Sequence, residues 1–243
     1  MSLEGKVVIV TGAGRGIGRA IALRFAAEEA KLALAARTVE QIDRVADEVR
    51  AQGGTAVAVP ADVGNESDVK AMVARTEAEL GPIDILVNNA GVMILRPIAE
   101  TSLEEWERVI NTNLTGMFLC SRAVLPSMMR RKTGRIINIG SLAGRRGYPD
   151  QGVYCASKHG LYGLSKVLAI EGRPYGIRVN VVSPGGALTK LSKELLAARK
   201  PSEAEEWMTS EEVADAVYYV AAQEGPATTD ELVLRRFAGE PWR

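Results

Sequence analysis

Short apolar runs alternate along the chain with longer segments of helical spacing. The runs are rich in Val, Ile, Leu and Ala and predict seven β-strands, at 6–10, 32–36, 55–59, 83–88, 135–140, 177–182 and 231–234. The intervening segments carry Ala, Leu, Glu, Arg and Lys at helical spacing, near 17–28, 39–51, 66–80, 103–130, 153–172 and 211–223. This alternation predicts right-handed βαβ crossovers and an α/β fold with a doubly wound parallel sheet.

No boundary divides the chain into two domains. It has no low-complexity linker, repeat or long block of like charge, so a single domain over 1–243 is predicted. The least regular segment, 185–210, combines Gly and Pro with a stretch rich in Lys and Glu. Long irregular segments are often functional, and we interpret this one as a substrate-binding flap, with a solvated pair of helices as the alternative.

Composition and charge narrow the class of partner. The chain is 47% hydrophobic and 25% charged, and its thirty basic residues balance thirty acidic ones. A neutral chain has no overall field to attract nucleic acid or an anionic membrane, and no apolar stretch approaches the roughly 18 residues of a membrane span. Cys120 and Cys155 lie in apolar stretches without Cys-x-x-Cys spacing, as expected of reduced packing residues. We therefore expect a cytoplasmic protein that binds a small molecule, with no nucleic-acid or membrane partner.

A glycine-rich turn, Thr11-Gly12-Ala13-Gly14-Arg15-Gly16-Ile17-Gly18, follows the first predicted strand and opens the first helix. Glycines let the backbone approach a pyrophosphate, and the N–H groups that begin a helix favour an anion. Such turns also occur as structural loops, but this position in an alternating pattern favours dinucleotide binding. The expected contacts are Gly12, Arg15, Gly16, Ile17 and Gly18.

The end of the second predicted strand indicates which nicotinamide cofactor binds. An acid there accepts a hydrogen bond from a ribose 2′-OH, whereas arginine pairs with a 2′-phosphate. This strand ends in Ala35-Ala36-Arg37 without an acid, and Arg15 in the glycine turn is a second candidate. NADP(H) is therefore preferred and NAD(H) remains possible; the alternative is that both arginines contact only solvent.

Further motifs follow in order along the chain. They are Asp62-Val63, Asn88-Asn89-Ala90-Gly91, Ser141, Tyr154-Cys155-Ala156-Ser157-Lys158, and Pro184-Gly185 with Thr189. With the glycine turn, this set resembles the short-chain dehydrogenase/reductase family from residue 3 to about 225, and is similar to its 3-oxoacyl-(acyl-carrier-protein) reductases. The resemblance implies strand order 3-2-1-4-5-6-7 and an NADP(H)-dependent carbonyl reductase or alcohol dehydrogenase. It also implies roles for residues outside the glycine turn: Asp62 and Val63 at adenine; Asn89, Ala90 and Gly91 at the adenosine and ribose; Pro184 and Gly185 in the cofactor-binding motif; and Thr189 at the carboxamide or phosphates.

Tyr154 and Lys158 are four residues apart, so they share one helix face. A nearby ammonium favours the phenolate and is expected to lower the tyrosine pKa, which would let Tyr154 exchange a proton with an alcohol or carbonyl oxygen. Ser141 would hydrogen-bond the same oxygen, and Lys158 would also bind the ribose hydroxyls. The resemblance assigns a fourth catalytic position to Asn113, which would hold a water leading from the lysine to solvent; Asn111 is interpreted as a packing or surface residue.

The substrate remains open. The expected lining is mostly apolar, at 93–95, 142–148 and 185–191, and suits a hydrophobic ketone or acyl chain, but Arg145 and Arg146 could bind a carboxylate. The alternatives are a hydroxy-acid or sugar-alcohol dehydrogenase and a non-catalytic dinucleotide sensor. The basic residues Arg130, Arg131 and Lys132 either dock an acidic carrier protein or complement a helix dipole.

Metal chemistry is not expected, because the single histidine, His159, has no convergent partners in the sequence. It is interpreted as a packed or surface residue. The helical segments 103–130 and 153–172 resemble the family's dimer-forming pair, so a homodimer or homotetramer is expected. The C-terminal segment departs from the usual Asp-Gly-Gly ending, which puts the second tetramer contact in doubt.

Overall fold

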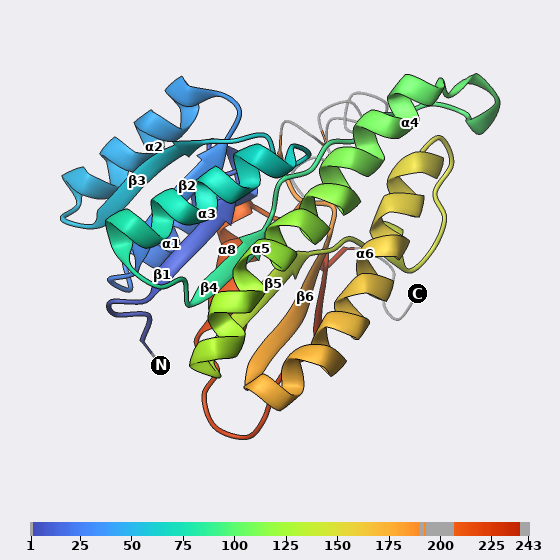
Figure 1. Ribbon diagram of the computed structural model, residues 1–243. Helices are drawn as coiled ribbons and strands as arrows, with labels where there is room; N and C mark the ends of the chain where they lie inside the picture. Colours follow the sequence, from blue (N-terminus) through green and yellow to red (C-terminus); the bar gives the residue numbers. More distant parts are fainter. Residues whose placement is uncertain (1, 190–191, 193–206, 239–243) are drawn as a thin grey trace.

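A single parallel sheet organises the part of the chain that the computed structural model describes, residues 2–189, 192 and 207–238. The strand order is β3-β2-β1-β4-β5-β6-β7, which confirms the predicted topology (Figure 1). The strands are β1 (Val7–Thr11), β2 (Lys31–Ala36), β3 (Thr55–Pro60), β4 (Ile85–Asn88), β5 (Gly134–Ile139), β6 (Ile177–Gly185) and β7 (Glu231–Arg235). The order reverses between β1 and β4, and the carboxyl ends of strands at such a switch point form a ligand crevice.

Helices cover both faces of this sheet. They are α1 (Gly16–Ala26), α2 (Val39–Ala51), α3 (Glu66–Leu80), α4 (Leu103–Ile110), α5 (Gly116–Arg131), α6 (Gly152–Gly172) and α8 (Ser210–Ala221). Successive strand residues point to opposite faces: Val8 and Val10 pack with α1, α2 and α8, whereas Val7 and Ile9 pack with α3, α5 and α6. Both faces of the central strands are therefore buried, which explains why they read as continuous apolar runs.

The predicted helix at 103–130 is interrupted. A π-helical turn, η2 (Asn111–Thr115), separates α4 from α5. The chain is helical throughout the predicted range, but hydropathy spacing cannot distinguish one wide turn from a regular one, so this turn was not predicted. Such turns are frequent at functional sites, and this one includes Asn113.

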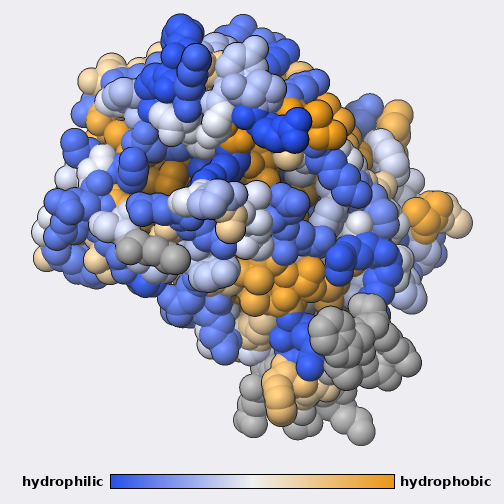
Figure 2. Space-filling view, turned by 90° about the horizontal axis from the view of Figure 1, so that it is seen from below, coloured by the Kyte–Doolittle hydropathy of each residue, from blue (hydrophilic) through white to orange (hydrophobic). Residues whose placement is uncertain are grey.

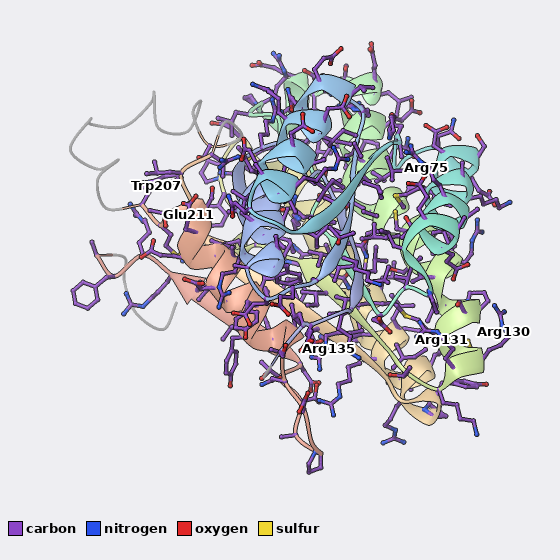
Figure 3. All side chains as sticks on the ribbon, turned by 90° about the vertical axis from the view of Figure 1, so that its left-hand side faces the viewer. Arg75, Arg130, Arg131, Arg135, Trp207 and Glu211 are labelled. Carbon is purple, nitrogen blue, oxygen red and sulfur yellow. The ribbon has the colours of Figure 1, made fainter. Side chains whose placement is uncertain are left out.

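The end of the molecule where the strands begin is stabilised by arginines. Figure 2 shows this end from below, with hydrophilic residues between separate hydrophobic patches. Buried Arg135 donates hydrogen bonds to the backbone oxygens of Val220 and Gln223 at the end of α8. In the basic cluster of Arg130, Arg131 and Lys132, Arg131 pairs with Asp84 at 3.0 Å, whereas Figure 3 shows Arg130 pointing outward from the end of α5.

Several expectations concern the chain beyond this sheet. Among the described residues, no helix combines the length and apolar character needed to cross a membrane. Most of the expected flap at 185–210 lies outside the described residues. Its near end continues β6, because Pro184 and Gly185 pair with β7 rather than beginning a loop.

Candidate active site

The glycine turn is held against the end of β4 by side chains from both strands. The hydroxyl of Thr11 accepts hydrogen bonds from the backbone N–H groups of Asn89 and Ala90, at 3.0 and 3.1 Å. The amide of Asn89 donates to the backbone oxygens of Thr11 and Gly12, at 2.9 and 3.2 Å. Asn89 and Ala90 therefore shape the turn itself, while Gly91 next to them is exposed.

Two glycines show why no side chain fits inside this turn. Gly12 has a φ of +65°, a left-handed conformation that L side chains rarely adopt, and a Cβ there would lie 2.9 Å from the Cα of Ala90. A Cβ on Gly18 would lie 2.2 Å from the backbone oxygen of Gly12. The turn thus brings its backbone close to the adjoining strand and leaves its outer side open to a ligand.

The start of α1 fits a dinucleotide phosphate. The helix begins at Gly16, followed by Ile17 and Gly18, and in the described structure no side chain caps it and no acid lies in its first turn. Its first N–H groups are therefore available to an anion. Thr189, from the segment after β6, lies across the turn: its methyl group would be 3.6 Å from a Cβ on Gly16.

The residues expected at the adenosine end lie at the ends of β2 and β3. Arg37 and Asp62 are both partly exposed, with a 3.8 Å separation between Nη1 and Oδ2. Asp62 also accepts a hydrogen bond from the backbone N–H of Gly64 at 2.9 Å, and Val63 beside it is buried. Arg15 is exposed and its side chain pairs with no residue in the described ranges. Two guanidinium groups are therefore accessible at this end of the crevice.

Tyr154, Lys158 and Ser141 meet beyond the carboxyl end of β5. α6 places Tyr154 and Lys158 on one face, with Nζ 5.7 Å from the centroid of the tyrosine ring. Nζ donates to the backbone oxygen of Ile139 at 2.6 Å. Ser141 follows β5, and its hydroxyl accepts from the N–H of Ala143 at 3.1 Å, which fixes it beside the tyrosine.

The electrostatics differ from the expected lowering of the tyrosine pKa. Burial raises the pKa of Tyr154 to about 12, with a hydrogen bond to Ser141 acting in the opposite direction. Burial also lowers the pKa of Lys158 to about 8. Both shifts favour the neutral forms, because removal from water disfavours charge on either group. In this state Tyr154 is therefore a protonated phenol, able to donate a proton.

Asn113, in the π-helical turn, orders the segment after β4. Its Oδ1 accepts from the backbone N–H of Val92 at 2.8 Å and its Nδ2 donates to the backbone oxygen of Val92 at 2.9 Å. Nδ2 also donates to the hydroxyl of Ser157 at 3.1 Å. The side chain thus links the segment leading to Met93 with α6, while Asn111 contacts the backbone of Gly64 at 3.4 Å.

The structure adds a buried polar cluster that the sequence analysis missed. Asn88 donates to the side chains of Asn138 and Ser121 at 2.9 and 3.1 Å, and Asn138 donates to Ser165 at 2.9 Å. All four residues are buried. The available signal was an asparagine inside each of two otherwise apolar strands.

Two arginines lie on the side expected to receive substrate, and one of them forms an ion pair with a carboxylate. Arg145 pairs with Glu231 at 3.1 Å. Arg146 donates to the hydroxyl of Tyr148 at 2.8 Å and forms no ion pair within the described part of the chain. Met93 and Tyr148 pack against the cluster that contains Tyr154, giving this side an apolar wall.

Other ionisable side chains do not form a metal site. The described residues contain no group of three or more His, Cys, Asp or Glu side chains placed to hold a metal ion. His159 is exposed, and its Nδ1 lies 2.8 Å from the backbone oxygen of Cys155. Cys120 and Cys155 are both buried and free.

The chain matches one family model and is similar in sequence to known reductases. Residues 6–200 match the family model described as short chain dehydrogenase. The chain is 43% identical over 197 residues to a 3-oxoacyl-(acyl-carrier-protein) reductase of Synechocystis, covering 81% of this chain and 80% of that protein. It is 38% identical over 240 residues to the corresponding enzyme of Escherichia coli, covering 96% of each.

Solved structures resemble it over similar lengths. A metagenomic short-chain oxidoreductase in complex with NADP matches with a TM-score of 0.84 and 36% identity, covering 97% of this chain and 99% of that one. A short-chain type dehydrogenase/reductase from Mycobacterium marinum matches with a TM-score of 0.90 and 35% identity, covering 96% and 95%.

Proposed function

Because the chain belongs to the short-chain dehydrogenase/reductase family, whose members are NAD(P)-dependent oxidoreductases acting on CH–OH groups, we propose that it is an NADPH-dependent reductase of 3-oxoacyl thioesters. The burial of Tyr154 is the observation that supports carbonyl reduction as the direction of the reaction. Tyr154 is 9% exposed, and burial raises its pKa to about 12. A phenol that remains protonated at neutral pH is ready to donate to a carbonyl oxygen.

The catalytic residues proposed are Asn113, Ser141, Tyr154 and Lys158. Tyr154 donates its phenolic proton to the substrate oxygen, and Ser141 hydrogen-bonds the same oxygen. The bound nicotinamide supplies the hydride. Lys158 binds the ribose hydroxyls and carries positive charge beside the tyrosine. Asn113 fixes the segment after β4 and borders the route from Lys158 towards solvent.

The cofactor-binding residues proposed follow the crevice at the carboxyl ends of the strands. The fit rests on the uncapped start of α1 and on the closely packed glycine turn. The full set is Gly12, Arg15, Gly16, Ile17, Gly18, Arg37, Asp62, Val63, Asn89, Ala90, Gly91, Tyr154, Lys158, Pro184, Gly185 and Thr189. Arg37 and Arg15, accessible and close to the end of β2, favour NADPH over NADH because a 2′-phosphate pairs with guanidinium groups.

The substrate class rests on two further observations. The chain is similar to 3-oxoacyl-(acyl-carrier-protein) reductases over up to 96% of its length, and Met93 and Tyr148 offer an apolar wall to an acyl chain. A second candidate, a hydroxy-acid dehydrogenase, is favoured by Arg146, whose charge no described carboxylate neutralises.

A homo-oligomer is proposed as the working form. Apolar side chains are exposed on α4 and α6, with Leu103 70%, Ile170 71% and Val167 48% accessible. Self-association would remove this surface from water. Light scattering coupled to size exclusion measures the state directly: a mass near 26.0 kDa at micromolar concentration would contradict the proposal.

The function is tested first by calorimetric titration with NADPH and with NADH. Consumption of the tighter cofactor is then followed with acetoacetyl thioesters, simple ketones and, in the oxidative direction, hydroxy acids. Tighter NADPH binding with turnover of the thioester supports the proposal. Turnover confined to hydroxy acids supports the second candidate, and binding without turnover on any of them supports a dinucleotide sensor.

A further inference from the structure

One buried oxygen beside the active site has no hydrogen-bond partner among the described residues. Asn88 ends β4 and is 6% exposed, and its Oδ1 is buried and unpartnered. Such an atom is unfavourable by about 1–3 kcal/mol when left alone. Native proteins therefore usually supply a protein donor or an ordered water.

A chain of hydrogen bonds fixes which end of the Asn88 amide is the oxygen. Ser165 donates its hydroxyl proton to the backbone oxygen of Leu161 at 2.7 Å, so it accepts from Nδ2 of Asn138 at 2.9 Å. Oδ1 of Asn138 must then face Nδ2 of Asn88, at 2.9 Å. A flipped Asn88 amide would place two amide oxygens against each other. Oδ1 of Asn88 is therefore committed to a different neighbour.

A small cavity on the α5–α6 side of β4 borders Asn88. The cavity has a volume of about 10 Å³, and its lining includes Thr11, Asn88, Thr112, Asn113 and Lys158. This is the size of a single water site, and a stable buried water needs two to four polar partners. A lysine ammonium has three N–H donors, of which one is directed to Ile139.

We propose that Asn88 is a positioning residue that holds one water molecule in this cavity, and that this water accepts a hydrogen bond from Lys158 and stabilises its ammonium form. The water donates one proton to Oδ1 of Asn88. All donors in the chain then point one way, from Lys158 through the water, Asn88, Asn138 and Ser165 to a backbone oxygen. Aligned donors polarise one another and favour positive charge at the start of the chain.

Few other charges act on this amine. Tyr154, with its ring centroid 5.7 Å from Nζ, is the titratable side chain recorded in contact with Lys158, and no carboxylate within the described ranges forms an ion pair with Nζ. Burial alone lowers the pKa of Lys158. The proposed water and its amide chain therefore oppose the effect of burial on this amine, where no described carboxylate does so.

The first test uses the cofactor-free wild-type protein. A crystal structure at a resolution that orders single waters is expected to show one within hydrogen-bond distance of both Oδ1 of Asn88 and Nζ of Lys158. An absence of density there would overturn the proposal, and this result does not depend on any variant folding.

The second test measures the titration of Lys158 by NMR with carbon-13-labelled lysine, again without cofactor. Asn88→Leu removes the oxygen while keeping the branched shape of the side chain, and is expected to raise the acid dissociation constant of Lys158 about tenfold. Ser121→Ala is the matched control, because it removes one acceptor of Nδ2 and leaves Oδ1 and the cavity in place. An unchanged Lys158 titration in Asn88→Leu would overturn the proposal.

The consequence for turnover rests on the proposed function. In Asn88→Leu, the shift of the Lys158 titration to lower pH should reappear as a shift of the kcat–pH profile to lower pH, whereas a purely structural role would lower kcat equally at all pH values. If the water and the titration are as expected but no carbonyl substrate turns over, the water site stands and the proposed function fails. If substrates turn over and Lys158 titrates unchanged in the variant, the function stands and this inference fails.

Discussion

Replacing Lys158 with methionine tests how strongly burial acts on the active-site amine. Lys158 is 5% exposed, and burial lowers its pKa from 10.5 to about 8. Methionine has a similar length and carries no charge. At pH 7 the wild-type amine is protonated in both the folded and unfolded states, so folding transfers an ammonium out of water.

The magnitude follows from the pKa difference. A pKa lowered from 10.5 to about 8 opposes folding by about 3 kcal/mol at pH 7. Methionine removes this penalty but leaves the backbone oxygen of Ile139, now 2.6 Å from Nζ, without its donor, which costs about 1–3 kcal/mol. Lys158→Met is therefore expected to be at least as stable as wild type at pH 7, by about 0–2 kcal/mol, while losing activity.

The way the free energy of unfolding changes with pH shows whether burial lowers or raises the pKa of Lys158. Between the folded pKa of about 8 and the unfolded value of 10.5, the unfolded state binds more protons, so wild-type stability rises with pH in this window. Below pH 8 the penalty is nearly constant. The stability of Lys158→Met relative to wild type is thus expected to fall by about 1 kcal/mol between pH 7 and pH 9.

Urea unfolding of the cofactor-free proteins at pH 7, 8 and 9, followed by circular dichroism, measures this difference. Lys166→Met, at an exposed position of α6, is the matched control, and its difference from wild type should not change with pH. An advantage of Lys158→Met that stays constant from pH 7 to pH 9 would refute the reasoning, because the folded amine would then titrate as it does in the unfolded chain.

Three other substitutions have sharp expected outcomes. Tyr154→Phe should lower kcat by about 10²–10⁴-fold with an unchanged Kd for NADPH, and retained turnover would contradict the proton-donor role. Gly18→Ala places a methyl group 2.2 Å from a backbone oxygen and should weaken NADPH binding about tenfold or more. The control Gly163→Ala, with open space around its Cβ, should leave NADPH binding unchanged. Arg37→Asp should shift the NADPH-to-NADH affinity ratio about tenfold or more towards NADH. The exposed control Arg44→Asp should leave this ratio unchanged. Equal ratios in the two variants would contradict the proposal that Arg37 binds the 2′-phosphate.

The fold was predictable where the relevant physics is local. Alternating strand and helix periods gave the element order, and right-handed crossovers between parallel strands left few topologies; the observed sheet has the predicted order. The glycine turn also depends on contiguous residues, since its conformation follows from positions that exclude a Cβ. By contrast, the π-helical turn at Asn111–Thr115 has the same hydropathy spacing as a regular helix and could not be seen.

The sequence by itself determined the helix face and the strand ends on which the proposed catalytic residues lie, because residue spacing sets the helix face and strand ends set the edge of the sheet. It placed Tyr154 and Lys158 on one face, and put Ser141 at the end of a strand. Only the tertiary structure decided their protonation, since burial depends on residues from the whole chain: it raises the pKa of Tyr154 and lowers that of Lys158. The same holds for Asn88 and Asn138, 50 residues apart in the chain, which become hydrogen-bonded neighbours only because β4 and β5 pair in register.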